Sequence, residues 1–360
     1  MSPLSRRQLL IASGAATFGL AGCASRPSGP ARPEHTTGTA TARSSDPAGI
    51  RHAKPLVLTQ TQQQADRTLA SVTRLDKHPL WFMTWYGDGA TIAEHHTTAS
   101  NANYVPGFAC TLWVATGTHG KPIVGRNWDW EHGPGLAMAS RTKAARTLTL
   151  TDTTFLGLGD GSKALDSHDE KTQEALLHAE TQLVEGINEH GVFIGLAADE
   201  QGIPTTSKDR PVVGGLSVQR LVLDRSRTVE DAINTFRSVD VDFTGGPALH
   251  YLVADRHGGA AVIEFDQGKL YVERRPAAQP WLCLENFHMA TVKGKDRAQQ
   301  TRWSTCAKTL GAAHGVMDEE AAFDLLDNVR QGITQWSSVY DLAAGTVSVH
   351  TSVGKHSLTV

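Results

Sequence analysis

The stretch 108–130 reads FACTLWVATGTHGKPIVGRNWDW and contains two strand-like apolar runs joined by a polar connection. The runs are CTLWVATG and IVGRNWDW, and the connection THGKP is rich in turn-forming residues, so the pattern predicts a β-hairpin. If the turn is centred on the HG pair, facing residues have numbers that sum to about 239. This register places Cys110 opposite Asp129, with Arg126 one diagonal step away.

The predicted hairpin end combines a thiol, a guanidinium and a carboxylate. A nearby cation lowers the pKa of a thiol and so increases its thiolate fraction. Two roles for Cys110 stay open at this point, a buried core cysteine and a nucleophile, and Arg126 with Asp129 could equally form a structural ion pair. A nucleophile needs a base, either a histidine or its own α-amino group, whose ordinary pKa is about 7.7–8.0. The second solution requires cleavage between Ala109 and Cys110.

Composition narrows the class of protein. The 360 residues are 40% hydrophobic and 20% charged, with a formal net charge of -3, which suffices for a packed core. Positive and negative residues are interspersed along the chain, so we expect no nucleic-acid partner. We also expect no cofactor and no metal. Glu94, His95 and His96 could suggest a metal site, but adjacent histidines on one strand or loop point apart, so these three are interpreted as solvated loop residues.

The N-terminus has the features of an export signal. Residues 1–22 contain a basic start with paired Arg6 and Arg7, a short apolar run, and small residues before Cys23. The arginine pair resembles a twin-arginine signal and the small residues a lipoprotein cleavage box, whereas the apolar run is too short to remain as a membrane-spanning helix. We therefore predict lipidation of Cys23 and anchoring at the outer face of the cell membrane or in the periplasm. An ordinary signal peptide with an incidental Cys23 is the alternative.

Three further segments follow the signal. Residues 23–54 are rich in Pro, Ala, Ser, Thr and Gly and are predicted to form a flexible tether. Residues 55–109 are predicted to be a pro-segment that packs on the main domain, residues 110–360, because large apolar side chains require burial. Four aromatic residues of the pro-segment are expected to make this contact: Trp81, Phe82, Trp85 and Tyr86.

The other cysteines are Cys283 and Cys306. In an oxidising compartment they could form a disulfide. Whichever pair forms, one cysteine remains, and a leftover thiol in an exported protein indicates possible reactivity.

The remaining chain predicts long antiparallel strands with helices between them. Residues 249–275 read as a three-strand meander, and residues 216–239 as a helical stretch broken near 225–228. His250, on an apolar strand, is expected to be a satisfied core histidine rather than a base. This combination predicts an α+β layered sandwich.

The motif Cys110-Thr111, followed by Gly125-Arg126-Asn127-x-Asp129, resembles the opening of the choloylglycine hydrolase family. These are linear-amide C–N hydrolases of the N-terminal-nucleophile class, with penicillin V acylase-like and acid-ceramidase-like branches. Further similarities follow in sequence order between about 110 and 345. They are EGINEHGVFIGL (Gly186, Asn188, Glu189, Gly191), LHYLVADRHGGAAVIEF (His250, Asp255, Glu264), LENF (Asn286) and TRWSTC (Arg302).

The resemblance implies an αββα four-layer sandwich and assigns roles by position. Cys110 would be the nucleophile through its thiolate and the base through its amine, with Arg126 and Asp129 orienting that terminus. Asn286 would donate to the tetrahedral oxyanion, and Arg302 would balance charge or hold the substrate. The implied reaction is attack on an amide, formation of a thioester acyl-enzyme, release of the amine, and hydrolysis.

The chain departs from bile salt hydrolases at two places. A long segment precedes Cys110, which resembles the acid-ceramidase-like and acyltransferase branches, whose precursors cleave themselves. Ala197 lies where bile salt hydrolases carry an oxyanion-hole asparagine, which makes bile-salt activity less expected. The substrate expected is a small N-acyl amide. Acyl transfer to an amine, and a non-catalytic lipoprotein that binds an acyl compound, are the alternatives.

Overall fold

The computed structural model describes residues 56–92, 109–130, 133–158, 165 and 170–360. The chain divides into two compact units, Met1–Gly49 and Ile50–Val360, and every described residue belongs to the second unit. The predicted signal, the lipidation site Cys23, the tether and the Glu94–His96 run lie outside the described residues. No helix of the described part is long and apolar enough to cross a bilayer.

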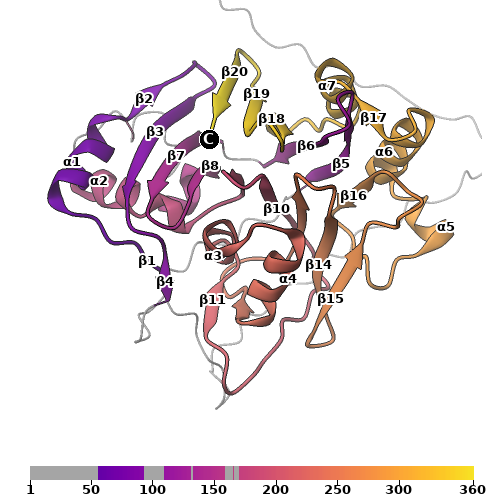
Figure 1. Cartoon of the computed structure of the whole chain (residues 1–360), viewed down its shortest axis with the longest axis horizontal. Helices are drawn as coiled ribbons and strands as arrows, with labels where there is room; N and C mark the ends of the chain where they lie inside the picture. Colours follow the sequence, from indigo (N-terminus) through magenta and orange to yellow (C-terminus); the bar gives the residue numbers. More distant parts are fainter. Residues whose placement is uncertain (1–55, 93–108, 131–132, 159–164, 166–169) are drawn as a thin grey trace, which may run out of the picture. The chain divides into compact units, whose positions relative to one another are not determined.

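Two large sheets form the centre of the described unit (Figure 1). One sheet has the order β15-β14-β13-β10-β9-β8-β7-β3-β2. Its strands are β2 Thr73–Arg74, β3 Leu80–Gly87, β7 Gly135–Thr142, β8 Arg146–Asp152, β9 Glu185–Asn188, β10 Val192–Ala198, β13 Leu249–Asp255, β14 Ala260–Asp266 and β15 Lys269–Arg274. The predicted three-strand meander is therefore β13, β14 and β15.

The second sheet contains the predicted hairpin and has the order β16-β5-β6-β18-β19-β20, with β17 also pairing with β5. Its strands are β5 Thr111–Gly117, β6 Pro122–Asp129, β16 Leu282–Glu285, β17 Val316–Met317, β18 Thr334–Asp341, β19 Thr346–His350 and β20 Lys355–Thr359. All eight residues of β6 are buried, because one face of this sheet meets the other sheet and its opposite face is covered by helices.

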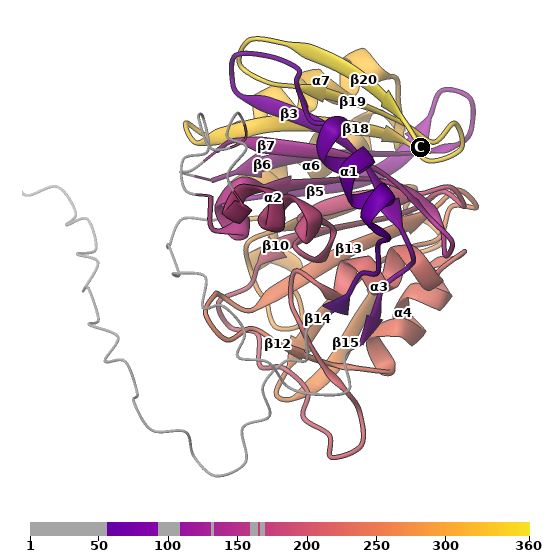
Figure 2. The same cartoon turned by 90° about the vertical axis from the view of Figure 1, so that its left-hand side faces the viewer.

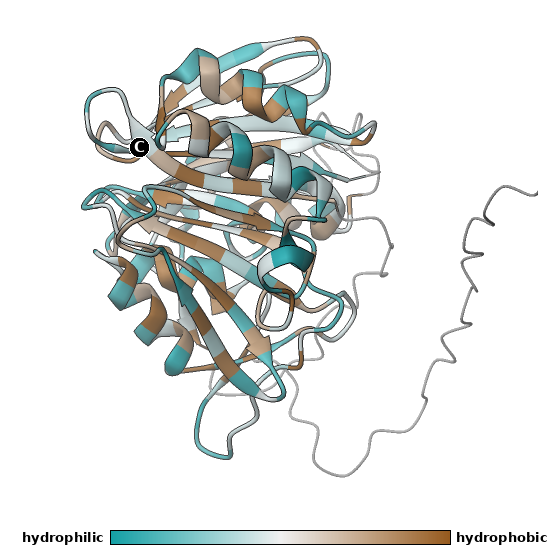
Figure 3. Ribbon diagram, turned by 90° about the vertical axis from the view of Figure 1, so that its right-hand side faces the viewer, coloured by the Kyte–Doolittle hydropathy of each residue, from teal (hydrophilic) through white to brown (hydrophobic). Residues whose placement is uncertain are grey.

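Helices cover the outer faces of the two sheets, as Figures 1 and 2 show. Contacts place α1 (Gln62–Ala70) on β3, α3 (Val218–Arg225) on β9 and β10, and α4 (Val229–Arg237) on β13. On the second sheet, α6 (Thr301–Ala312) contacts β5 and β16, and α7 (Glu319–Asn328) contacts β6 and β18. Apolar segments follow the strands, whereas the helices alternate polar and apolar patches (Figure 3). The result is the αββα order predicted from the sequence.

Shorter elements complete the described unit. They are α2 Glu170–Leu177, α5 Gly294–Arg297, the 3₁₀ turns Thr153–Leu156 and Ala179–Thr181, and two small sheets, β1 Leu56–Val57 with β4 Thr91–Ile92 and β11 Val212–Gly214 with β12 Asp240–Asp242. The break between α3 and α4 agrees with the prediction. Thr228 starts α4 with a capping box, in which its side chain and that of Asp231 each accept a backbone N–H.

The segment before Cys110 adds strands to the first sheet. β3 pairs in parallel with β7 over its whole length. Trp81 and Trp85 are buried, and Trp85 Nε1 donates to the carbonyl oxygen of Leu177 at 2.9 Å, whereas Phe82 and Tyr86 are half-buried. This segment is therefore integral to the core of the folded chain.

The hairpin exists, but the predicted register is wrong by one residue. Thr111 pairs with Asn127 and Leu112 with Arg126, so Asp129 lies opposite Ala109. The reason is the turn, in which Gly117 donates to the carbonyl oxygen of Lys121 and Gly120 adopts a left-handed φ of 72°. A three-residue loop that ends in a left-handed glycine replaces the symmetric turn. The one-residue shift moves Asp129 to the opposite face of the ribbon from its predicted place.

Candidate active site

Cys110 lies immediately before β5 and is fully buried. On the face of the hairpin that meets the other sheet, Arg126 Nη2 donates to Cys110 Sγ at 3.7 Å. The same guanidinium donates through Nη1 to the carbonyl oxygen of Val184 and stacks 4.9 Å over the Trp128 ring. The predicted pairing of a thiol with Arg126 is present.

Glu185 is a site residue to which the sequence reasoning assigned no role. It is fully buried on β9, 3.9 Å from Arg126 Nε, and accepts hydrogen bonds from Trp336 Nε1 at 2.6 Å and Ser338 Oγ at 2.8 Å. A buried guanidinium requires a counter-charge, and Glu185 supplies it from the opposite sheet. The sequence did offer a clue to Glu185, because it is the first residue of the EGINEHG motif.

Asp129 occupies the other face of the hairpin, where α6 packs. Thr334 Oγ1 donates to Asp129 Oδ1, and Arg302 Nη1 lies 3.8 Å from Oδ2. Oδ2 is buried and has no hydrogen-bond partner among the described residues. Burial raises the pKa of Asp129 to about 6, although the hydrogen bond from Thr334 and the charges of Arg302 and Arg126 oppose this shift.

Arg302 holds the backbone on both sides of Cys110. Its Nη1 donates to the carbonyl oxygen of Ala109, to that of Cys110 at 2.6 Å, and to Thr111 Oγ1 at 2.9 Å. Its Nη2 lies 3.1 Å from Glu285 Oε1. The guanidinium therefore joins α6 to the start of β5, and it polarises the carbonyl group of the Ala109–Cys110 peptide bond.

Asn286 follows β16 directly. Its Oδ1 accepts from Arg302 Nη2 at 3.2 Å, and its Nδ2 donates to the carbonyl oxygen of Ala198 at 3.0 Å. Glu285 pairs with Thr111, so continuing this register places Asn286 opposite Cys110. One of the two Nδ2 hydrogens remains for a further acceptor. The five residues predicted from the sequence thus gather around the Ala109–Cys110 bond.

The thiol itself is not activated in the intact chain. Burial raises the pKa of Cys110, and the nearby charge of Asp129 adds to this effect, whereas the charges of Arg126 and Arg302 oppose it. Because Cys110 is preceded by Ala109, its nitrogen is an amide and cannot serve as a base. A free α-amino group arises only after the peptide bond is cut.

Residues 116–357 match the model of a family described as acyl-coenzyme A:6-aminopenicillanic acid acyl-transferase. The chain belongs to this family. The match covers more than half of the chain and begins shortly after Cys110. No match was found among curated proteins.

Solved structures are similar in fold at low sequence identity. A variant of conjugated bile acid hydrolase from Clostridium perfringens has a TM-score of 0.50 and 12% identity, covering 70% of this chain and 92% of that chain. Penicillin V acylase from Agrobacterium tumefaciens has a TM-score of 0.49 and 14% identity, over 69% and 84% of the two chains. A Caenorhabditis elegans ortholog of N-acylethanolamine-hydrolyzing acid amidase has a TM-score of 0.45 and 18% identity, over 65% and 93%. The likeness to the bile acid hydrolase supports the predicted αββα fold of N-terminal-nucleophile hydrolases, which is confirmed.

Two other motifs that carried the resemblance have structural roles. Asn188 Oδ1 accepts the N–H groups of His190 and Val192, both at 3.0 Å, as expected for a turn former. Asp255 Oδ1 accepts the N–H groups of His257 and Gly259 in the β13–β14 turn, at 2.9 and 3.0 Å. Neither side chain contacts Cys110 in the part of the chain described.

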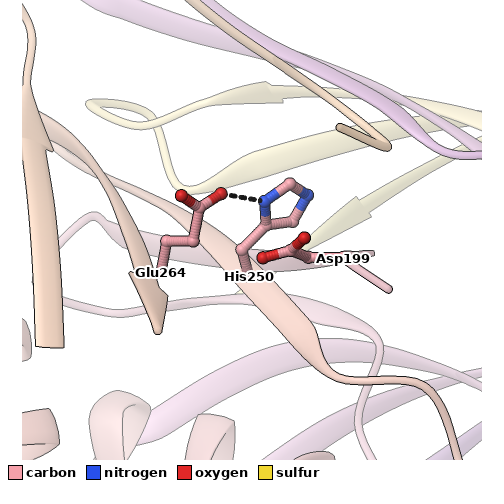
Figure 4. A group of neighbouring side chains, drawn as sticks. All are labelled: Asp199, His250 and Glu264. Atoms are coloured by element: carbon pink, nitrogen blue, oxygen red, sulfur yellow. Dashed lines mark hydrogen bonds and ion pairs between the residues drawn. The ribbon is translucent and has the colours of Figure 1, made fainter. Parts of the chain in front are cut away.

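A second group of side chains could hold a metal ion. It consists of Asp199, His250 and Glu264, whose ligand atoms lie within 4.8 Å of one another (Figure 4). His250 Nδ1 is 2.9 Å from Glu264 Oε1, whereas His250 Nε2 is buried without a described partner. Imidazole and carboxylate ligands would suit a divalent transition metal. However, the Glu264 oxygens already accept the N–H groups of Met289 and Ala290, at 2.8 and 2.6 Å, so hydrogen bonds account for this residue without an ion.

Cys283 and Cys306 are free and buried in one apolar cluster, together with Trp113 and Leu310. β16 carries Cys283 and α6 carries Cys306. Neither residue takes part in the site around Cys110.

Proposed function

We propose that this chain is an amidohydrolase that cuts itself between Ala109 and Cys110 and then cleaves a linear, non-peptide C–N amide bond of a small N-acyl substrate. The observation that carries the proposal is the hydrogen bond from Arg302 to the Ala109 carbonyl oxygen, with the Cys110 thiol held next to that carbonyl group by Arg126. A structural cysteine would not need one cation at its side chain and another at the carbonyl group that precedes it.

In the self-cleavage step, Cys110 Sγ attacks the carbonyl carbon of Ala109, and the negative charge develops on the oxygen that Arg302 contacts. The thiol proton passes to the nitrogen of Cys110, whereas Asp129, on the other face of the hairpin, acts on the thiol through its charge. The C–N bond breaks, the nitrogen of Cys110 takes up the proton and leaves as an amine, and a thioester joins Ala109 to Sγ. Water then hydrolyses the thioester and restores the thiol.

The mature site reuses the same groups on an external amide. The new α-amino group takes the thiol proton and later delivers it to the leaving amine. Asp129 and Arg302 keep this terminus in place, and the spare Nδ2 hydrogen of Asn286 donates to the tetrahedral oxyanion. An oxyanion donor of this kind contributes about 2.7–4 kcal/mol. The products are an amine and an acid, with a thioester on Cys110 as the intermediate.

Intact-mass measurement of the purified protein tests the proposal. The wild-type chain should give two fragments whose boundary is Ala109–Cys110, whereas Cys110→Ala should give one uncut chain without turnover. Cys306→Ala, which removes another buried thiol, is the matched control and should still be processed. A wild-type chain that stays uncut yet hydrolyses amides would refute the mechanism.

A screen of N-acyl amino acids, N-acyl ethanolamines, penicillin V and conjugated bile salts should identify the acyl and amine parts. The apolar, aromatic-rich sequence around Cys110 favours an acyl chain. Complete absence of turnover and of a Cys110 acyl adduct would support the alternative of a lipoprotein that only binds an acyl compound.

Acyl transfer to an amine is the second candidate, and the description of the matched family favours it. Both reactions share the thioester, and they differ only in the acceptor. Adding a small amine to the processed enzyme with a good substrate distinguishes them. A transferase would form the new amide at the expense of the free acid.

We also propose that the enzyme is exported and attached to the membrane through a lipid on Cys23, on the basis of the N-terminal sequence. After self-cleavage the anchor would remain on the smaller fragment, which contributes β3 to the core. Replacing Cys23 with Ala should move both fragments from the membrane fraction to the soluble fraction. Release of only the larger fragment from the wild-type membrane would contradict this arrangement.

A further inference from the structure

The loop that carries Asn286 is held in place by side chains from other elements. This segment, residues 286–292, connects β16 to α5 and is called the Asn286 loop below. Within it, the N–H groups of Thr291 and Val292 bond to the carbonyl oxygen of His288 at 3.3 and 2.9 Å. A loop without a strand partner depends on such external bonds for a defined position.

Glu264, on β14, provides one of these attachments. Its two oxygens accept the N–H groups of Met289 and Ala290, at 2.8 and 2.6 Å. His250 Nδ1 lies 2.9 Å from Oε1 and fixes the orientation of the carboxylate. Glu264 therefore fixes the backbone of the Asn286 loop through these two hydrogen bonds.

His288 provides the second attachment. Its Nδ1 is 2.7 Å from Asp199 Oδ2, and its Nε2 is 3.2 Å from Asp266 Oδ1. When the ring is protonated, both ring nitrogens donate to these carboxylates. The side chain is only 2% exposed, which makes these carboxylates its principal source of charge compensation.

The two attachments lie next to the catalytic contact. Asp199 directly follows Ala198, whose carbonyl oxygen accepts the hydrogen bond from Asn286. Asn286 and His288, two residues apart, are thus fastened to two consecutive residues at the end of β10. A shift at His288 would move Asn286 relative to Cys110.

We propose that His288 is a positioning residue: its ring, held between Asp199 and Asp266, keeps the Asn286 loop where the Asn286 amide can donate to the oxyanion. This inference rests on the proposed function, because it assumes that role for Asn286. Loss of the ring proton would break one of the two carboxylate bonds and leave the carboxylates of the cluster uncompensated, which would loosen the loop.

The charges around His288 come from every element packed against it. Asp199 directly follows β10, Glu264 and Asp266 lie on β14, and His250 lies on β13. From α5, Arg297 donates to the carbonyl oxygens of Met289 and Val292 at 3.0 and 3.2 Å. Burial lowers the pKa of His288, but Asp199, Glu264 and Asp266 together raise it above its usual value. The attachment is therefore complete below the usual histidine value of 6.5 and is lost as the pH rises through the raised pKa of His288.

The pH dependence of kcat in self-processed enzyme tests the inference. His288→Asn should lower kcat by about 10- to 100-fold with KM changed less than about threefold, because misplacement of a catalytic donor affects the transition state. The alkaline fall in kcat of the wild-type enzyme should disappear in this variant. Asp266→Asn, which keeps an oxygen acceptor but removes one charge, should lower kcat less than His288→Asn and should move the alkaline limb to lower pH. His257→Asn, at an exposed histidine in the β13–β14 turn, should change neither.

A spectroscopic readout separates this inference from the proposed function. In the uncut Cys110→Ala chain, the Asn286 side-chain amide resonance should shift with the same midpoint as the His288 ring. This measurement does not need turnover or a folded His288→Asn variant. An Asn286 resonance that ignores the titration of His288, or a wild-type pH profile in His288→Asn, would overturn the inference. Absence of amidase activity in the wild-type enzyme would instead contradict the proposed function.

Discussion

The β5–β6 hairpin and the Asn286 loop bring the predicted site residues to the same point by different means. In the hairpin, strand pairing positions Cys110, Arg126 and Asp129, so their placement follows from backbone hydrogen bonds and the turn. In the loop, side-chain bonds to Arg302, Glu264 and Asp199 position Asn286 and its neighbours. The comparison predicts that the placement of the hairpin residues tolerates surface charge changes, whereas the placement of the loop depends on the charge state of its supports.

The largest effect is expected at the residue that joins the two regions. Arg302→Met should slow self-cleavage by at least about 10²-fold, because the carbonyl oxygen of Ala109 loses its cationic donor. Timed intact-mass measurement on refolded precursor provides the rate. Arg274→Gln, in an exposed pair with Glu230, is the matched control. If Arg302→Met were processed at the normal rate, Arg302 would have no part in self-cleavage.

The next effect concerns pH on the hairpin side. If the Asp129 carboxylate stabilises the amine that forms at Cys110, self-cleavage should accelerate as the pH rises through about 6, the value to which burial raises the pKa of Asp129. The effect of Asp129 on the free energy of unfolding has the opposite dependence on pH. The raised pKa of Asp129 favours the folded chain fully below its usual value of 3.8, and this contribution disappears as the pH rises through about 6. Asp129→Asn in the Cys110→Ala background should remove this pH dependence of unfolding, whereas an unchanged profile would assign the titration elsewhere.

Replacement of Glu185 tests whether the hairpin depends on the buried ion pair between Arg126 and Glu185. Glu185→Ala leaves the buried Arg126 without its counter-charge and should lower the free energy of unfolding by about 3–5 kcal/mol. Glu189→Ala removes the partially exposed pair with Arg146 and should cost no more than about 1 kcal/mol. Urea denaturation of both variants gives the comparison. Equal losses would show that Arg126 is solvated or compensated by another group.

The smallest effect is expected at the far end of the hairpin. Gly120 has a φ of 72°, and an added Cβ would meet no atom within 4 Å, so Gly120→Ala costs only backbone strain, about 1–2 kcal/mol. Gly120→Asn should cost less, because asparagine tolerates the left-handed region. Thermal unfolding with the processing rate measured in parallel checks both variants. A change in processing would mean that the turn controls the register at Cys110.

The sequence alone was sufficient for the architecture and for the identity of the residues that meet at the site. The apolar runs around THGKP predict the hairpin, because alternation and turn chemistry are local properties. The five predicted residues, Cys110, Arg126, Asp129, Asn286 and Arg302, do gather at one point. What the sequence pattern left undetermined was the face on which Asp129 lies, because one residue in the turn decides the register.

Tertiary structure decided which distant groups support these five. Glu185 lies on another sheet, and His288 meets Asp199 and Asp266 only when β10 and β14 are packed beside the Asn286 loop. Such contacts depend on how layers stack, and no local pattern of one chain encodes the distance between them. The residues for which we propose the chemistry were therefore visible in the sequence, whereas the residues that hold them in position became visible only in the folded chain.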